Sequence, residues 1–210
     1  MKFIFRVLVA AVCLTLASGA EMPLWQAPIP SNIERFVPVG WVSTQSVQGD
    51  LNGDGMADVA SVLEREDTVD GNPVEVAGSR GLLVLLADPS GGYRFQDFAP
   101  EALPCVSCLG DLGGEPHAPA IKLAIAGQRL TVRWRRDFPQ TKEIKLIIGY
   151  DSERGALRLL GDEALTADRL SGKTVRVVRD YRAGTMTSDG RESRLAPRFI
   201  PLIEVSAEDL

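Results

Sequence analysis

Residues 50–58 read Asp50-Leu51-Asn52-Gly53-Asp54-Gly55-Met56-Ala57-Asp58, in which oxygen-bearing side chains recur at short intervals among small residues. Calcium is a hard cation that takes about six to eight oxygen ligands. The side-chain oxygens fall at loop positions 1, 3, 5 and 9, which are occupied by Asp50, Asn52, Asp54 and Asp58. A glycine at position 6, Gly55, permits the sharp turn that points them inward, and the backbone carbonyl near Met56 supplies a further oxygen. The stretch therefore predicts a calcium-binding loop.

The residues that follow separate this loop from an EF-hand. An EF-hand ends with a bidentate Glu at position 12, whereas position 12 here is Ser61. Val59–Leu63 is a short apolar run rich in β-branched residues, which predicts a strand rather than a helix. A ligand loop that leads directly into a strand resembles the calcium loops of FG-GAP and VCBS repeats. That resemblance implies Asp50, Asn52, Asp54 and Asp58 as the side-chain ligands; the alternative is an Asx- and Gly-rich turn that binds no metal.

The remaining sequence predicts an all-β protein with short strands and many turns. Trp41–Val47 leads into the loop, and Gly81–Ala87 is a continuous apolar run suited to a central strand. Roughly nine strands follow one another at the spacing of an antiparallel sandwich, a barrel or a small propeller-like fold. The other predicted strands are Gly92–Phe95, Ile121–Ala126, Arg129–Arg135, Lys142–Tyr150, Ala156–Leu160 and Lys173–Tyr181.

A propeller would need several repeats, and the calcium motif occurs once. Gly110–Glu115 echoes Gly49–Asp54 but lacks ligands at positions 3 and 9. This echo fits either a decayed second repeat or chance similarity between Gly- and Asp-rich loops.

The first twenty residues have the composition of a secretory signal peptide. Two basic residues precede the apolar run Val7–Leu16, and small residues follow up to Ala20. Cleavage after Ala20 is favoured over lipidation at Cys13, and no other stretch approaches the roughly 20 apolar residues of a membrane span. The expected organisation is a signal peptide (1–20), a Pro-rich N-terminal segment (21–38) and a single β-rich calcium-binding domain (39–210) in a periplasmic or secreted protein.

Composition and cysteine spacing restrict the other possibilities. The formal net charge of −5 argues against nucleic acid as a partner. Cys105 and Cys108 form a C-x-x-C pair in loop-like sequence, which predicts a disulfide in an exported protein. Free thiols and a redox or metal site remain the alternatives.

No pattern of catalytic residues stands out. The single histidine, His117, lies between prolines with no serine or thiol signature nearby. Neither a phosphate-binding glycine loop nor a zinc-protease motif occurs. A catalytic carboxylate pair is defined by distance in space, so it stays open, but no spacing recommends it. The sequence favours a protein that is not an enzyme.

Two basic segments are candidates for contact with a protein partner. Arg133 and Arg135 are predicted to share one face of a strand, with Trp134 on the opposite face in the core. Charged neighbours suggest that the Tyr181 ring is exposed, and tyrosine with arginine is a common composition of interface hot spots. The alternatives are a solvated strand face and a strand-end tyrosine that covers the edge of the core. The candidate partner-binding residues are Arg179, Tyr181 and Arg182.

The chain resembles exported proteobacterial proteins with one FG-GAP-like calcium loop. More loosely, it is similar to periplasmic immunity proteins that inhibit lysozyme-like effectors. The resemblance implies a calcium-stabilised binding protein, most concretely an inhibitor that inserts a polar loop into the cleft of a peptidoglycan hydrolase. A structural or envelope-assembly protein is the alternative, and a hydrolase of unknown substrate is third. The landmarks that carry the resemblance are Phe36–Trp41, Gly49–Leu63, Gly81–Leu86, Cys105 with Cys108, Tyr150-Asp151, Leu159–Gly161 and Arg169–Lys173.

Overall fold

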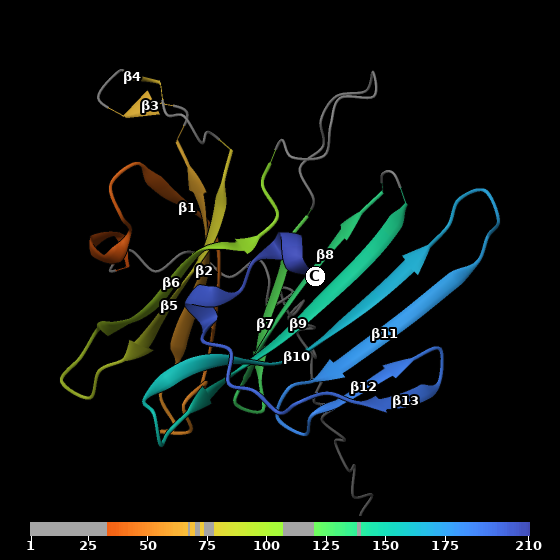
Figure 1. Ribbon diagram of the computed structural model, residues 1–210. Coiled ribbons are helices and arrows are strands. Elements are labelled where there is room, and N and C mark those ends of the chain that lie inside the picture. The colour runs from red at the N-terminus through yellow and green to blue at the C-terminus, as the bar shows by residue number, and fades with distance from the viewer. Residues whose placement is uncertain (1–32, 67, 70–71, 74–77, 107–119, 138–139) are drawn as a thin grey trace, which may run out of the picture.

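Two antiparallel sheets face each other in a computed structural model that describes residues 33–66, 68–69, 72–73, 78–106, 120–137 and 140–210 (Figure 1). The four-stranded sheet has the order β1-β2-β5-β6, and the seven-stranded sheet has the order β13-β12-β11-β10-β9-β8-β7. The all-β prediction is confirmed, and of the predicted alternatives the antiparallel sandwich is the observed one.

Most strands follow one another along the chain as antiparallel neighbours. The smaller sheet consists of β1 (Trp41–Gly49), β2 (Asp58–Arg65), β5 (Arg80–Ala87) and β6 (Tyr93–Leu103). The larger sheet consists of β7 (Lys122–Ala126), β8 (Arg129–Arg136), β9 (Thr141–Asp151), β10 (Ala156–Ala167), β11 (Thr174–Asp180), β12 (Thr185–Ser188) and β13 (Arg191–Arg194). A separate ladder joins β3 (Thr68–Val69) to β4 (Asn72–Pro73), and the short 3-10 segments are η2 (Glu34–Phe36), η3 (Leu202–Glu204) and η4 (Ala207–Asp209).

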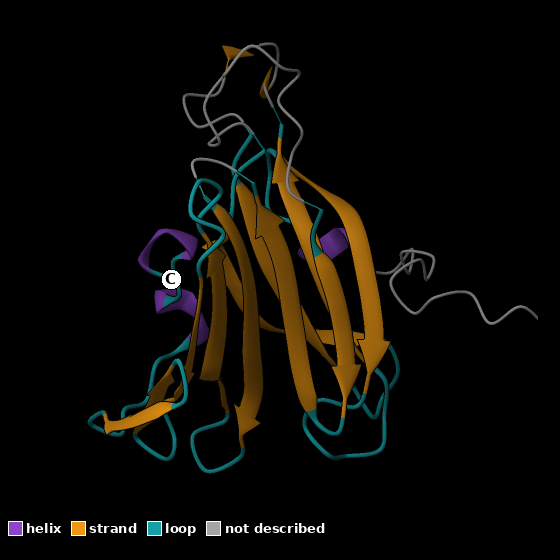
Figure 2. Cartoon of the chain, turned by 90° about the vertical axis from the view of Figure 1, so that its right-hand side faces the viewer, coloured by secondary structure: helices purple, strands orange, loops and turns teal. Residues whose placement is uncertain are grey.

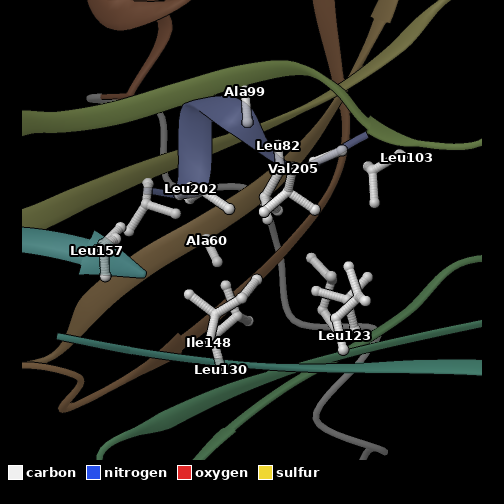
Figure 3. Close-up of a cluster of buried hydrophobic side chains, with 14 of the residues drawn as sticks. Ala60, Leu82, Ala99, Leu103, Leu123, Leu130, Ile148, Leu157, Leu202 and Val205 are labelled. Carbon is white, nitrogen blue, oxygen red and sulfur yellow. The ribbon is translucent and has the colours of Figure 1, made fainter. Parts of the chain in front are cut away.

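The main core fills the space between the sheets (Figure 3). Ala60, Leu82 and Ala99 face it from the smaller sheet, and Leu130 and Ile148 face it from the larger one. In β8, the buried Leu130, Val132 and Trp134 alternate with more exposed residues, as the two-residue repeat of a strand requires. The prediction that Arg133 and Arg135 share a face opposite Trp134 is confirmed.

A second apolar cluster covers the outer face of the four-stranded sheet. Ile33 is fully buried there against Val59, Leu63, Leu83 and Leu85. This cover explains the unbroken apolar runs of β2 and β5, because both faces of these strands are removed from water.

The C-terminal segment lies beside the gap between the sheets (Figure 1, blue; Figure 2, purple). It pairs with the first half of β10, where the backbone N–H of Leu159 donates to the carbonyl of Ile200 at 2.9 Å. β11 pairs with the second half of β10, from Gly161 onward. A register shift between Leu159 and Gly161 marks a β-bulge at the change of partner.

Several element boundaries differ from the predictions. β6 reaches Leu103 and β10 reaches Ala167, whereas the sequence predicted strands that end at Phe95 and Leu160. The signal peptide, Cys13 and the Gly110–Glu115 echo lie outside the described residues. Within the described ranges, no helix has the length and apolar character needed to cross a membrane.

Candidate metal centre

The candidate calcium loop joins β1 to β2 at the end of their ladder. Gly49 and Asp58 are the last paired residues, and the chain between them leaves the sheet. Gly53 and Gly55 have φ angles of +86° and +82°, which residues with a Cβ rarely adopt. The two glycines therefore allow nine residues to turn back sharply, as predicted from the position of Gly55.

Backbone amides orient the three side chains at positions 1, 3 and 5. The carboxylate of Asp50 accepts from the N–H of Gly53 at 2.6 Å and from that of Gly55 at 3.0 Å. The Asn52 Oδ1 accepts from the Asp54 N–H at 3.0 Å, and the Asp54 Oδ1 accepts from the Met56 N–H at 2.8 Å. Such Asx turns fix the loop in one conformation. They also keep the three oxygen-bearing side chains on a loop that is open to solvent.

Asp58 has a different environment from the other three candidate ligands. Its side chain is fully buried, and its Oδ2 accepts from the N–H of Leu51 at 2.7 Å and of Asn52 at 3.3 Å. Its Oδ1 accepts from the N–H of Ala87 at the end of β5, at 2.8 Å. Burial raises the pKa of Asp58, although the three backbone hydrogen bonds act in the opposite direction. In this arrangement Asp58 fastens the start of the loop to two neighbouring segments, and its predicted ligand role stays a prediction.

The donor set suits a hard cation in type. Asp50 and Asp54 supply carboxylate oxygens and Asn52 an amide oxygen, while the Asn52 Nδ2 donates to the Asp54 Oδ2 at 2.8 Å. Among the described residues, no group of three or more His, Cys, Asp or Glu side chains is arranged for a metal ion. The loop itself gathers two exposed carboxylates and one amide, so the carbonyl of Met56 and water would complete the coordination of a calcium ion.

The opposite sheet contacts the loop through a residue that the sequence analysis did not select. A Cβ at Gly53 would lie 3.0 Å from the Nε2 of Gln128, in the β7–β8 turn. Gly127 and Gln128 both have positive φ angles, of 55° and 59°, which confirms the predicted two-residue hairpin. The proximity of this turn to the loop depends on the sandwich packing, so no local sequence signal could have revealed it.

The predicted exposure of Tyr181 is wrong. Its side chain is only 4% exposed, and its hydroxyl donates to the Asp162 Oδ2 at 2.7 Å. The Arg198 guanidinium lies 4.9 Å from the centre of the ring. Burial, followed by the hydrogen bond to Asp162, raises the pKa of Tyr181. The ring is held at the edge of the core because the chain around it pairs with Leu160 on one side and Arg198 on the other.

The other candidate partner-binding residues do not form one surface with Tyr181. Arg179 is partly buried and donates to the Asp162 Oδ1 at 2.8 Å. Arg182 lies exposed in the turn after β11. The structure thus joins Arg179 and Tyr181 through Asp162, a residue that the sequence analysis missed because its partners lie 17 and 19 residues away.

The predicted disulfide falls at the limit of the described chain. Cys105 follows β6 and is partly buried, whereas Cys108 and His117 lie outside the described residues. The disulfide and the loop position of His117 therefore stay predictions.

Comparisons of the whole chain with protein-family models, with curated proteins and with solved structures gave no match. The case for a function accordingly rests on the loop and its surroundings.

Proposed function

We propose that the chain is a calcium-stabilised, exported binding protein without catalytic activity. The observation that carries this proposal is the loop of residues 50–58. It presents Asp50, Asn52 and Asp54 on one exposed turn and is fastened to the sheet by the buried Asp58. A loop with fixed side chains pays little ordering cost when it binds a ligand.

Bound calcium would supply positive charge to a turn that carries two carboxylates. Asp50, Asn52, Asp54 and the carbonyl of Met56 would hold it, while Asp58 and the two glycines keep the backbone in place. An ion that binds only the folded chain stabilises it by mass action, by about 2.7 kcal/mol at a concentration of 100 Kd. Calcium would therefore act as part of the fold at this end of the sandwich.

The proposed partner is a peptidoglycan hydrolase of the lysozyme type, blocked by a polar loop inserted in its cleft. Support comes from the acidic chain, the expected signal peptide and the loops that meet at the calcium end. At that end, the Gln96 Nε2 donates to the carbonyl of Gly155, which joins β6 to the β9–β10 turn. A structural or envelope-assembly role is the alternative, and a hydrolase is third.

Asp54→Ala tests the calcium part of the proposal. Its melting temperature in calcium buffer should fall to the value that the wild type shows in chelator, because a ligand at position 5 has been removed. Asp88→Ala is the matched control, since Asp88 lies exposed in the neighbouring β5–β6 turn and outside the loop. Equal calcium responses in Asp54→Ala and the wild type would contradict calcium binding by this loop.

An affinity capture from envelope extract tests the partner. We expect the wild type to retain a peptidoglycan hydrolase in calcium and to lose it in chelator, and the retained enzyme should be inhibited by the protein. Capture of assembly factors in place of a hydrolase would favour the structural role instead.

A further inference from the structure

A group of basic side chains lies on the inner face of the seven-stranded sheet. Arg136 on β8 pairs with Lys142 on β9, two residues beyond the buried pair of Trp134 and Ile144. Because side chains two residues apart share a face of a strand, Arg136 and Lys142 project from the face that carries the core. Arg179 on β11 has the same orientation. Its partner in the ladder, Asp162, is 2% exposed and lies opposite the core residue Leu146 on β9.

The negative charge close to these residues is already shared. Asp162 accepts from Arg179 through one oxygen and from Tyr181 through the other. Neither Arg136 nor Lys142 forms an ion pair within the described part of the chain, and the Arg136 Nε is buried without a hydrogen-bond partner there. Three cations thus surround one carboxylate whose two oxygens are both engaged.

Lys142 shows the cost of this arrangement. Burial lowers its pKa, and the charges of Arg136 and Arg179 lower it further, while Asp162 opposes them. The Lys142 Nζ donates to the main-chain oxygen of Leu210, so an oxygen acceptor already lies at the ammonium group. An anion at this position would relieve the repulsion and provide an acceptor for the Arg136 Nε.

We propose that Arg136, Lys142 and Arg179 form an anion-binding site that takes a carboxylate. Two guanidinium groups offer planar, paired donors that match a carboxylate, and the lysine adds a point charge. The site borders the apolar core through Trp134 and Ile144, so a singly charged organic acid loses less hydration there than a doubly charged phosphate. The carboxylate comes either from a free small acid or from an acidic side chain of a protein.

The site is tested on the full chain by titration at constant ionic strength with sodium acetate, sodium phosphate and a soluble pentaglutamate peptide. Binding is followed through the arginine Nε–H resonances in NMR spectra. We expect saturable shifts for Arg136 and Arg179 with a carboxylate probe. Tighter binding of acetate would indicate a small acid, and tighter binding of pentaglutamate would indicate a protein side chain.

Variants on one strand provide the control. Lys142→Met should weaken carboxylate binding about tenfold or more. Lys145→Met should not, because Lys145 lies on the outer face of β9, 3.9 Å from Glu163. Arg136→Gln provides a second loss variant if Lys142→Met fails to fold. Shifts that do not saturate in the wild type, equal affinity in both lysine variants, or preference for phosphate would overturn the proposal.

Discussion

The carboxylate of Asp58 joins the start of the calcium loop to the end of β5. In Asp58→Asn, one oxygen is replaced by an amide nitrogen, which cannot accept a hydrogen bond from the backbone. At least one buried N–H then loses its partner, and each such loss costs about 1–3 kcal/mol of unfolding free energy. We expect this loss in chelator as well as in calcium, measured by urea denaturation. A variant as stable as the wild type in chelator would show that Asp58 acts as a ligand alone.

Two other aspartates should give opposite dependences on pH. Burial raises the pKa of Asp97, so its contribution to stability is complete below the model value of 3.8 and is lost as pH rises through the folded pKa. Hydrogen bonds from Ser90 lower the pKa of Asp88, so its contribution is present above 3.8 and is lost as pH falls through the folded pKa. In chelator, Asp97→Asn should therefore gain stability relative to the wild type as pH rises from 3.8.

Asp88→Asn provides the opposite comparison. It should be less stable than the wild type at neutral pH and equal to it in acid. Urea denaturation of both variants and the wild type across this pH range measures the two differences. Parallel pH profiles for all three proteins would contradict the assigned causes of the pKa shifts.

In β10, the bulge at Gly161 leaves no room for a side chain. A Cβ at this position would lie 2.4 Å from the carbonyl oxygen of Arg179, which is backbone in the adjacent strand. Gly161→Ala should therefore force β10 and β11 apart and lower the unfolding free energy by about 1–3 kcal/mol. Gly149→Ala in β9 is the control, because its Cβ would meet the flexible end of Leu160 at 2.6 Å. Equal losses in urea denaturation would show that the backbone contact has no special cost.

The strands that were predicted well carry local signals, and the errors arise where distant segments meet. The alternation in β8 and the turn at Gly127-Gln128 are visible in the sequence alone. Gly161 was taken as the end of a strand because glycine weakens strands, whereas the bulge uses it to change the partner of β10. The environment of Tyr181 depends on Asp162, which lies 19 residues away, and the buried state of Asp58 depends partly on Ala87, 29 residues away. Neither contact leaves a mark in the nearby sequence.

The two sheets share one core, and η3 contributes Leu202 to it. Leu202 is fully buried in the same cluster as Leu82 of the smaller sheet and Leu157 of the larger one (Figure 3). Leu202→Ala should therefore weaken both sheets together and lower the unfolding free energy by about 2–5 kcal/mol. The neighbouring Ile203 is 56% exposed, so Ile203→Ala should change it by no more than about 0.5 kcal/mol.

Tryptophan fluorescence can follow each sheet separately in these variants. Trp41 belongs to β1 and the outer cluster, whereas Trp134 belongs to β8 and the main core. Proteins that keep only one tryptophan should unfold at the same urea concentration, and Leu202→Ala should shift both transitions equally, because a shared core unfolds as one unit. A shift of the Trp134 transition alone would mean that Leu202 stabilises the larger sheet by itself, and that the outer cluster suffices to keep the smaller sheet folded.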